Sequence, residues 1–233
     1  MSVLINKMGS LHVFEDIANQ DYFLAVDNIK MVLDGCSKDE NGEWLKSEVG
    51  VKLFSQLFER LPKDIRNNPE LLETCVNLIF DKLISLATDK SFISQNFCFT
   101  ILIVYELEEK FVVKYCGDGY IITRKKNVSE AEDELEYISL ESECNEGCPK
   151  YYVYNYISSK LYSEGVSFKT KEFSKEEYEN VGIASDGLRY LLDLGFPVKS
   201  KLDENLLNDK AGRIRVQIAR NYDSIKDDIT ICY

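Results

Sequence analysis

Residues 181–188 read Val181-Gly182-Ile183-Ala184-Ser185-Asp186-Gly187-Leu188, and this stretch decides the fold. Its apolar beginning, Val181 to Ala184, predicts a short buried strand. Asp186 stands at the end of that strand, and Gly187 lets the chain turn directly after the carboxylate. Because a buried carboxylate without a counter-ion is costly, we expect a cation near Asp186.

Three further acidic stretches occur along the chain, and two of them share the same Asp-Gly form. They are Val32-Leu33-Asp34-Gly35, Cys116-Gly117-Asp118-Gly119 and Asp227-Asp228-Ile229-Thr230. Asp34 and Asp227 each adjoin a short apolar run, as Asp186 does. Converging carboxylate oxygens suit a hard divalent cation such as Mg²⁺ or Mn²⁺. Two such ions can activate a water molecule and hold a phosphate.

Each Asp-Gly pair taken alone is also explained by a plain turn, because both residues tolerate positive φ angles. Gly117-Asp118-Gly119 in particular stands between two β-rich runs, which is typical of a β-hairpin. The hypothesis of a metal site therefore depends on the whole set of motifs and not on any one of them.

Composition narrows the class of protein. The chain has 233 residues, 45% of them hydrophobic, and its glycines and prolines are dispersed, so we expect a single domain over residues 1–233. A net charge of −12 argues against a nucleic-acid partner. No apolar run reaches the ~18 to 20 residues of a membrane span, so we expect no membrane partner. Seven scattered cysteines indicate reduced thiols in a cytoplasmic protein.

Hydrophobic periodicity and turn residues predict strands and helices in alternating groups. We expect helices at 47–61, from Asn68-Pro69 onward and at 213–222, and strands at 22–26, 30–33, 97–106, 111–115, 120–124, 166–173, 181–184 and 229–232. The aromatic stretch Tyr151–Tyr156 is compatible with a strand or with part of a flap. Sheets packed against helices are the expected architecture.

The residues of these motifs and their order along the chain resemble those of the metal-dependent type 2C protein serine/threonine phosphatases in their compact bacterial form. The resemblance runs from about Ser10 to Tyr233. It rests on Asn19-Gln20-Asp21, Val32-Leu33-Asp34-Gly35, Phe99-Thr100, Gly117-Asp118, Ala184-Ser185-Asp186-Gly187-Leu188 and Asp227-Asp228-Ile229-Thr230. The last two stretches are the most specific of the six.

The resemblance implies an α+β fold in which two antiparallel β-sheets pack as a sandwich flanked by helix pairs, a four-layer αββα arrangement. It also implies hydrolysis of phosphoserine and phosphothreonine in proteins by a hydroxide that bridges two Mn²⁺ or Mg²⁺ ions. No protein nucleophile is needed in such a reaction, which agrees with a chain that holds a single histidine.

The resemblance also assigns roles to individual residues. Asp34 bridges both ions and the Gly35 carbonyl binds one of them. Asp186 and Asp227 hold the first ion, and Asp21 orients the metal-bound water. Asp118, together with Asp186, forms a weaker site for a third ion. Asp228 is expected to be a neighbour of these ligands and not a ligand itself.

Two departures from the family pattern affect the binding of the substrate phosphate. The family has an arginine upstream of Asn-Gln-Asp, whereas this chain reads His12-Val13-Phe14-Glu15-Asp16-Ile17-Ala18 there. After Asp34-Gly35 the family continues with His-Gly-Gly or Met-Gly-Gly, whereas this chain has Cys36-Ser37-Lys38. His12 and Lys38 remain as weak candidates for a phosphate contact.

Three functional hypotheses therefore stay open. The first is an active phosphatase that acts as a monomer on a phosphorylated protein, paired with a cognate serine/threonine kinase. The second is a pseudophosphatase that serves as a binding or regulatory module. The third is a phosphatase that acts on a non-protein phosphoester. Retention of Asp34, Asp186 and Asp227 favours catalysis, and loss of the upstream arginine favours weak or altered catalysis.

Overall fold

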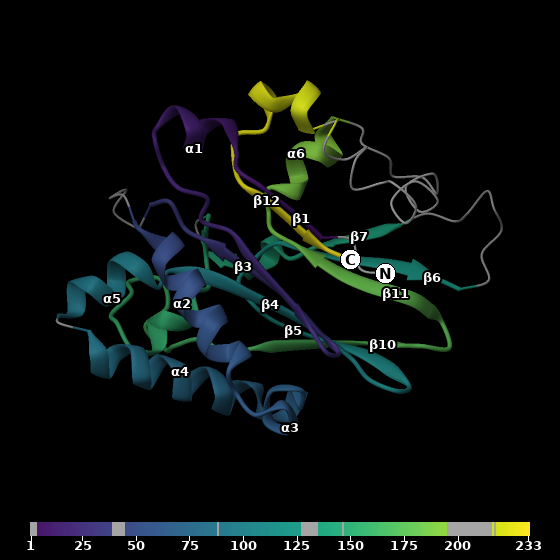
Figure 1. Cartoon of the computed structure of the whole chain (residues 1–233), viewed down its shortest axis with the longest axis horizontal. Coiled ribbons are helices and arrows are strands. Elements are labelled where there is room, and N and C mark those ends of the chain that lie inside the picture. Colours follow the sequence, from purple (N-terminus) through teal and green to yellow (C-terminus); the bar gives the residue numbers. More distant parts are fainter. Residues whose placement is uncertain are drawn as a thin grey trace.

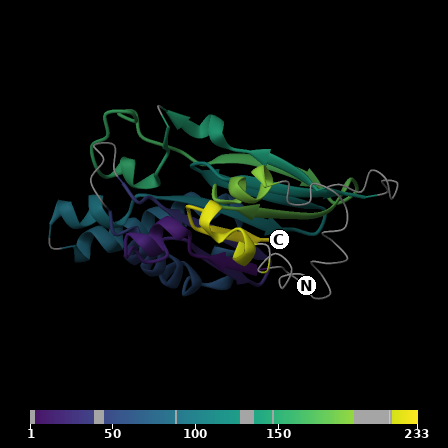
Figure 2. The same ribbon diagram turned by 90° about the horizontal axis from the view of Figure 1, so that it is seen from above.

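The computed structural model describes residues 4–38, 45–87, 89–126, 135–145, 147–194, 216 and 218–233. Two antiparallel sheets of five strands each pack face to face, and helices cover the two outer faces (Figures 1 and 2). The order of layers is therefore helix, sheet, sheet, helix. This is the αββα sandwich that the sequence resemblance predicts.

Sheet I contains the first and last strands of the described chain. Its strand order is β1 (Leu4–Lys7), β12 (Ile229–Cys232), β11 (Tyr178–Ala184), β6 (Tyr120–Lys125) and β7 (Glu136–Ser139). Sheet II has the order β10 (Lys169–Ser174), β5 (Lys110–Cys116), β4 (Phe99–Glu106), β3 (Ile29–Gly35) and β2 (Tyr22–Val26). A separate hairpin pairs β8 (Cys144–Asn145) with β9 (Cys148–Pro149).

The helices divide between the two outer faces, with most of them against sheet II (Figure 1). Those against sheet II are α2 (Ser47–Glu59), α3 (Lys63–Arg66), η1 (Pro69–Leu71), α4 (Leu72–Leu86) and α5 (Lys90–Asn96). Above sheet I lie α1 (Ser10–Phe14), α6 (Leu188–Asp193) and η4 (Tyr222–Ser224). Two further single turns are η2 (Glu141–Glu143) and η3 (Tyr152–Asn155).

The alternation of side chains along β4 explains how two separate cores form around one strand. Successive residues of a strand point to opposite faces of its sheet. Ile101, Ile103 and Tyr105 therefore pack with the helices outside sheet II. Leu102 and Val104 pack between the sheets. All five side chains are buried, so β4 is a central strand covered on both faces.

The helices outside sheet II follow the predicted boundaries closely. The expected helix at 47–61 is observed as α2, Ser47–Glu59. Asn68 begins the second helical region, where its side-chain oxygen accepts a hydrogen bond of 3.0 Å from the Glu70 backbone N–H. Pro69 occupies the first position of the following turn, which tolerates its missing N–H. Both predictions are therefore confirmed.

The predicted hairpin at Gly117-Asp118-Gly119 is wrong. β5 pairs with β4 and β10 in sheet II, whereas β6 pairs with β11 and β7 in sheet I. The turn therefore carries the chain from one sheet to the other. Gly117 and Gly119 have φ angles of +106° and +122°. A Cβ atom on Gly117 would lie 2.5 Å from Thr100 Cγ2, so this crossing needs glycine.

The aromatic stretch at 151–156 is not a strand. Tyr152–Asn155 form the single turn η3, and Tyr152 and Tyr154 are buried in the core outside sheet II. The Tyr152 and Tyr156 hydroxyls donate hydrogen bonds of 2.9 and 2.8 Å to Asn77 Oδ1 on α4. This stretch therefore fixes one edge of the helical layer.

The predicted helix at 213–222 lies largely outside the described residues. Residues 218–220 are helical, Ile218 is buried as expected, and Ala219 is exposed where the pattern placed it inside. β1 and α1 were not predicted at all. Within the described chain, no helix offers an apolar stretch that could traverse a lipid bilayer.

Candidate metal centre

The predicted ligands come together at one end of the sandwich. A pocket of about 430 Å³ is lined by Asp34, Gly35, Asp118, Asp186 and Asp227. They come from four separate places in the chain, namely the end of β3, the crossing between the sheets, the turn after β11 and the start of β12. The structure therefore brings together every predicted metal ligand.

Backbone hydrogen bonds hold two of these acidic stretches against each other. The Ser185 N–H donates to the Thr230 carbonyl, and the Thr230 N–H donates to Ser185 Oγ, each at 2.9 Å. This reciprocal pair ties the turn that carries Asp186 to β12. The Asp186 N–H in turn lies 3.4 Å from Asp34 Oδ2, so the two carboxylate positions are direct neighbours.

Gly35 allows the Asn19–Asp21 segment to approach the end of β3. Its N–H donates to the Gln20 carbonyl at 3.2 Å, which draws the Asn19–Asp21 segment onto β3. A Cβ atom on Gly35 would lie 2.7 Å from both the Gln20 oxygen and Ser47 Cβ. Only a glycine lets the chain pass between them, so Gly35 allows Asp21, next to Gln20, to come near Asp34.

Asp21 is buried behind the pocket. Its N–H donates to Asn19 Oδ1 at 2.9 Å, and its carbonyl accepts from Asn6 Nδ2 at 3.1 Å. Its Oδ2 atom is buried and has no hydrogen-bond partner in the described part of the chain. Thr100 lines the pocket, and its Oγ1 atom is likewise buried with no hydrogen-bond partner among the described residues. Such atoms suit a site that holds ordered water around a cation.

The carboxylates raise one another's pKa. Burial raises the pKa of Asp34 and Asp21 well above the ordinary value, and neighbouring carboxylates raise both further. Burial and the charges of Asp227 and Asp118 raise the pKa of Asp186 to about 7. Burial also raises the pKa of Asp118 and Asp227. Ionising this cluster at neutral pH is unfavourable until a cation offsets the repulsion.

The donor set fits Mg²⁺ or Mn²⁺. The predicted ligands are all oxygen atoms, which hard divalent cations prefer. Among the described residues, no three His, Cys, Asp or Glu side chains lie close enough together to hold a metal ion by themselves. Mg²⁺ is usually held by only one or two protein carboxylates and keeps several water ligands, so an open set of carboxylates around a pocket agrees with this chemistry.

His12 of α1 lies in the same pocket although it is remote from the acidic motifs in sequence. Its Nδ1 is 2.9 Å from Asp228 Oδ1, and its Nε2 is 2.9 Å from Ser37 Oγ and 3.6 Å from Asp227 Oδ1. Burial lowers the pKa of His12, but the hydrogen bond and charge of Asp228, together with Asp227 and Asp21, outweigh it and raise the pKa overall.

Asp228 organises the wall of the pocket. Its Oδ1 accepts a hydrogen bond of 2.9 Å from the Gly9 N–H, and its Oδ2 accepts one of 2.7 Å from the Gln20 N–H. With His12 it therefore ties α1 and the Asn19–Asp21 segment to β12. The structure gives Asp228 this anchoring position beside the predicted ligands, and the motif alone did not reveal it.

Solved structures with the same fold include several bacterial phosphatases. The structure titled "PppA, a key regulatory component of T6SS in Pseudomonas aeruginosa" superposes with a TM-score of 0.63 at 16% identity, covering 100% of this chain and 95% of that one. Stp1 from Staphylococcus aureus gives a TM-score of 0.59 at 14% identity, with 99% and 92% covered. The chain has the type 2C phosphatase fold.

A third structure with this fold contains metal. It is the catalytic domain of the Mycobacterium tuberculosis phosphatase PstP. Solved in complex with two manganese ions, it superposes with a TM-score of 0.56 at 14% identity, covering 100% of this chain and 96% of that one. No protein-family model matches the chain, and no curated protein matches it either. The structure therefore shows the type 2C fold although the sequence identities are only 14 to 16%. At such identities, the role of a single residue must be argued from its position in this structure.

The pocket of this type 2C fold has walls that the sequence did not predict. Lys38, a predicted candidate, lines it together with Lys226, Tyr151 and Tyr190, which were not predicted. The position of Lys226 directly before Asp227 was the one available signal. No sequence signal placed the two tyrosines at the pocket, because an aromatic residue at a pocket cannot be told from one in a core by sequence alone.

Proposed function

We propose that the chain hydrolyses phosphoserine and phosphothreonine in proteins with two Mn²⁺ or Mg²⁺ ions. One observation carries the proposal: four aspartates from separate stretches, Asp34, Asp118, Asp186 and Asp227, line one open pocket with Asp21 buried behind it, and burial and neighbouring carboxylates raise the pKa of all five. The manganese ions named for PstP support the choice of metal.

The residues present would hold the ions as follows. Asp34 would contribute to both, the Gly35 carbonyl to one, and Asp186 and Asp227 to the first ion. Asp118, next to Asp186, would complete a weaker third site. Bound ions of this kind lower the pKa of a water and offset charge on the phosphoryl oxygens.

The chain's own side chains would position the reactants. Asp21 presents a buried acceptor, Oδ2, that can orient a water behind Asp34. The lysines Lys38 and Lys226 line the pocket and would attract the substrate phosphate in place of the missing arginine. His12 is held by Asp228 with Nε2 toward Ser37 and Asp227, where its ring can donate to a phosphoryl oxygen.

The proposal extends to the biological setting. PppA, a regulatory component in Pseudomonas aeruginosa with the same fold, supports a regulatory phosphatase here. We propose that residues 1–233 act as one domain and as a monomer in the cytoplasm, on a phosphoprotein produced by a cognate serine/threonine kinase. A pseudophosphatase is the second candidate, because the stretch upstream of Asn19 supplies carboxylates and no arginine.

The decisive experiment is hydrolysis of a phosphothreonine peptide with Mn²⁺, with and without EDTA. The wild-type chain is compared with Asp186→Asn and with Asp193→Asn, a matched control because Asp193 is an exposed carboxylate on α6. We expect metal-dependent turnover in the wild type and in Asp193→Asn, and a loss of at least about a hundredfold in Asp186→Asn.

Mn²⁺ binding measured by calorimetry separates the remaining outcomes. Binding without turnover would favour the pseudophosphatase or a different phosphoester. Neither binding nor turnover would overturn the assignment of the metal centre.

A further inference from the structure

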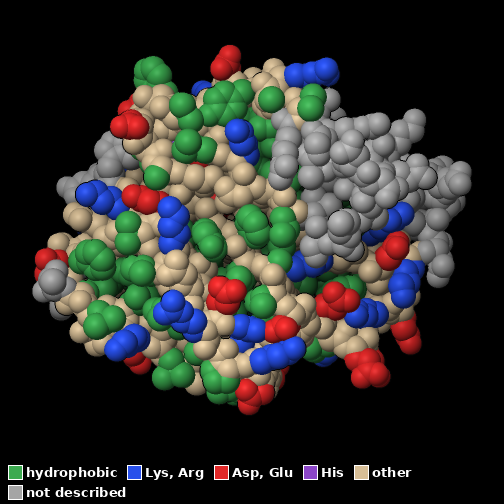
Figure 3. Space-filling model, in the orientation of Figure 1, with side chains coloured by type: hydrophobic (Ala, Val, Ile, Leu, Met, Phe, Trp, Pro, Cys, Tyr) green, Lys and Arg blue, Asp and Glu red, His purple; other side chains and the backbone are tan. Residues whose placement is uncertain are grey.

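α1 buries its histidine side chain and exposes its apolar ones, the opposite of a usual surface helix. Its one ionisable side chain, His12, is only 3% exposed, whereas Leu11, Val13 and Phe14 are 44%, 51% and 84% exposed. Surface helices normally bury their apolar residues and expose their charged ones. Hydrophobic side chains gather over α1 and η4 at the upper edge of the molecule in Figure 3. Three exposed apolar side chains on one five-residue helix, next to the pocket, are candidates for contact with another molecule.

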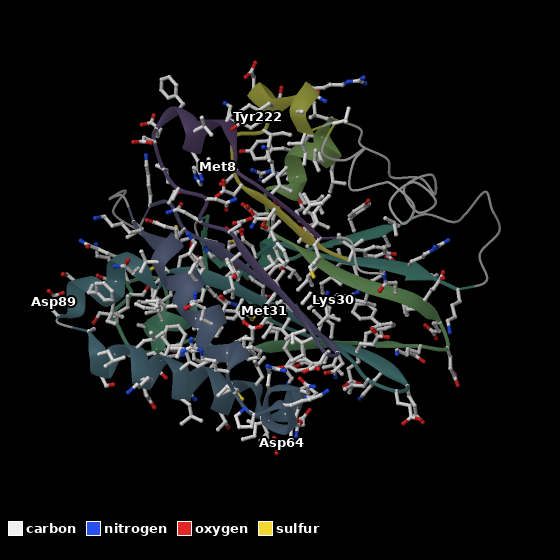
Figure 4. The ribbon with its side chains drawn as sticks, in the orientation of Figure 1. Met8, Lys30, Met31, Asp64, Asp89 and Tyr222 are labelled. Carbon is white, nitrogen blue, oxygen red and sulfur yellow. The ribbon has the colours of Figure 1, made fainter. Side chains whose placement is uncertain are left out.

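Polar contacts hold α1 in this orientation. The Ser10 and Leu11 N–H groups donate to the carbonyls of Ile225 and Lys226 at 2.8 and 3.2 Å. The Tyr222 hydroxyl donates to the Gly9 carbonyl at 3.3 Å, and Met8 and Tyr222 flank this junction (Figure 4). The helix is therefore attached through backbone groups and through His12, and its apolar side chains are left for another molecule.

The apolar surface of α1 is continuous with the pocket. Leu11 belongs to both, since it lines the pocket beside His12 and Lys226 and is also exposed on α1. Lys38 and Lys226 line this pocket together with the four aspartates, so a phosphate that enters it meets two lysines once cations offset the carboxylates. A phosphate group attached to an apolar segment complements both features, because the lysines attract the phosphate and α1 covers the apolar part.

We infer that α1 docks the substrate, and that the substrate is a phosphorylated protein segment with a large apolar side chain beside the phosphoresidue. This inference rests on the proposed function. Leu11 and Phe14 are separated by about 4.5 Å along a helix. Two residues of extended peptide span about 6.6 Å. We therefore test an apolar side chain two residues from the phosphothreonine, a spacing that can reach past Leu11 toward Phe14.

The test uses the full chain with Mn²⁺ and three substrates. Two are phosphothreonine peptides that differ only in leucine or serine two residues from the phosphothreonine, and the third is para-nitrophenyl phosphate. We expect the wild type to prefer the leucine peptide about tenfold in kcat/KM, and Phe14→Ser to lose that preference. Leu78→Ser is the matched control, because Leu78 is an apolar side chain on α4 that is 57% exposed, and it keeps the preference.

The outcomes separate the inference from the proposed function. Hydrolysis of all three substrates without a preference, or a preference that survives in Phe14→Ser and in the Val13→Ser, Phe14→Ser double variant, overturns docking on α1 alone. No hydrolysis of any substrate overturns the proposed function and the inference with it. A wild-type dimer that becomes a monomer in Phe14→Ser, measured by light scattering, assigns the surface to a second copy and also overturns the inference.

Discussion

At the scale of single residues, the carboxylate cluster makes the metal-free protein sensitive to pH. The pKa of Asp186 is raised to about 7 in the folded chain, and Asp21, Asp34, Asp118 and Asp227 are raised as well. A carboxyl group whose pKa is raised by folding stabilises the fold below its unfolded pKa of about 3.9. That contribution is lost as the pH rises through the folded pKa.

We therefore expect the free energy of unfolding in EDTA to fall by about 2 kcal/mol from Asp186 alone between pH 5.5 and pH 8. Thermal unfolding at the two pH values measures this change. If the proposed function holds, Mn²⁺ is expected to bind the ionised carboxylates and to reverse the trend, and Asp186→Asn should weaken the trend in EDTA. A midpoint in EDTA that is the same at both pH values would contradict the origin assigned to these pKa shifts.

The adjacent residues Asp227 and Asp228 should respond in opposite ways to the same substitution. Asp227→Asn removes a predicted ligand and should lower the affinity for Mn²⁺ without destabilising the metal-free chain. Asp228→Asn keeps one oxygen and replaces the other with an NH2 group, so either the Gly9 or the Gln20 N–H loses its acceptor, and the ion pair with His12 is lost as well. Leaving such a donor unpaired should cost about 1 to 3 kcal/mol of stability.

Urea unfolding in EDTA and Mn²⁺ calorimetry on both variants distinguish these roles. A metal-free Asp227→Asn chain that unfolds as early as Asp228→Asn would show that Asp227 is also an anchor.

At the scale of elements, the layer outside sheet II is stabilised by a cluster of stacked and tilted aromatic rings around Phe80 of α4. Its ring centroid lies 5.3 Å from that of Tyr156, 5.7 Å from Tyr152 and 5.9 Å from Phe54. This cluster joins α2, α4 and η3 to β4. Aromatic pairs at such distances contribute beyond the area that they bury.

Phe80→Ala should therefore lower the free energy of unfolding by about 3 to 5 kcal/mol, because it opens a cavity at the centre of the cluster. Phe92→Ala is the control, since Phe92 lies at the edge of the same layer and is 36% exposed. Chemical denaturation measures both variants. Equal losses would show that the layer has no single centre.

Local sequence signals predicted most elements but not how they pair. α2 and the start of the η1–α4 region were predicted because their apolar periodicity and their capping residues are local features. The crossing at Gly117–Gly119 was read as a hairpin because an Asp-Gly turn carries no information about which sheet receives the next strand. α1 was missed because it buries a histidine and exposes its apolar residues, which removes the signal that identifies helices.

At the scale of the whole molecule, the αββα sandwich was predicted through the family resemblance and not through periodicity. β1 pairs with β12 in a register that places Leu4 opposite Cys232, and no local pattern encodes such a distant pairing. The gathering of the predicted ligands at one pocket was predictable because each aspartate belongs to a short motif. Lys226, Tyr151 and Tyr190 were not, because three-dimensional proximity alone brings them to the pocket.

The net charge of −12 should act on the rate at which substrates arrive. Long-range attraction favours basic peptides and weakens as salt screens it. We expect kcat/KM for a phosphopeptide with several lysines to fall severalfold between about 50 and about 500 mM NaCl. These concentrations lie on either side of 0.1 M, where the Debye length is about 10 Å. Stopped assays with a matched glutamate-rich peptide provide the comparison, and an identical salt response for both peptides would contradict steering by the whole molecule.

The place of β12 in sheet I has a consequence for how the protein is made. β12 lies between β1 and β11, and both of these strands precede it in the chain. A ribosome that has released residues up to 220 therefore carries two strand edges with no strand to join them, and it has not yet supplied Asp227. The nascent chain therefore completes sheet I and acquires Asp227, a predicted metal ligand, in the same step, so a copy that stops before β12 lacks both that strand and that carboxylate.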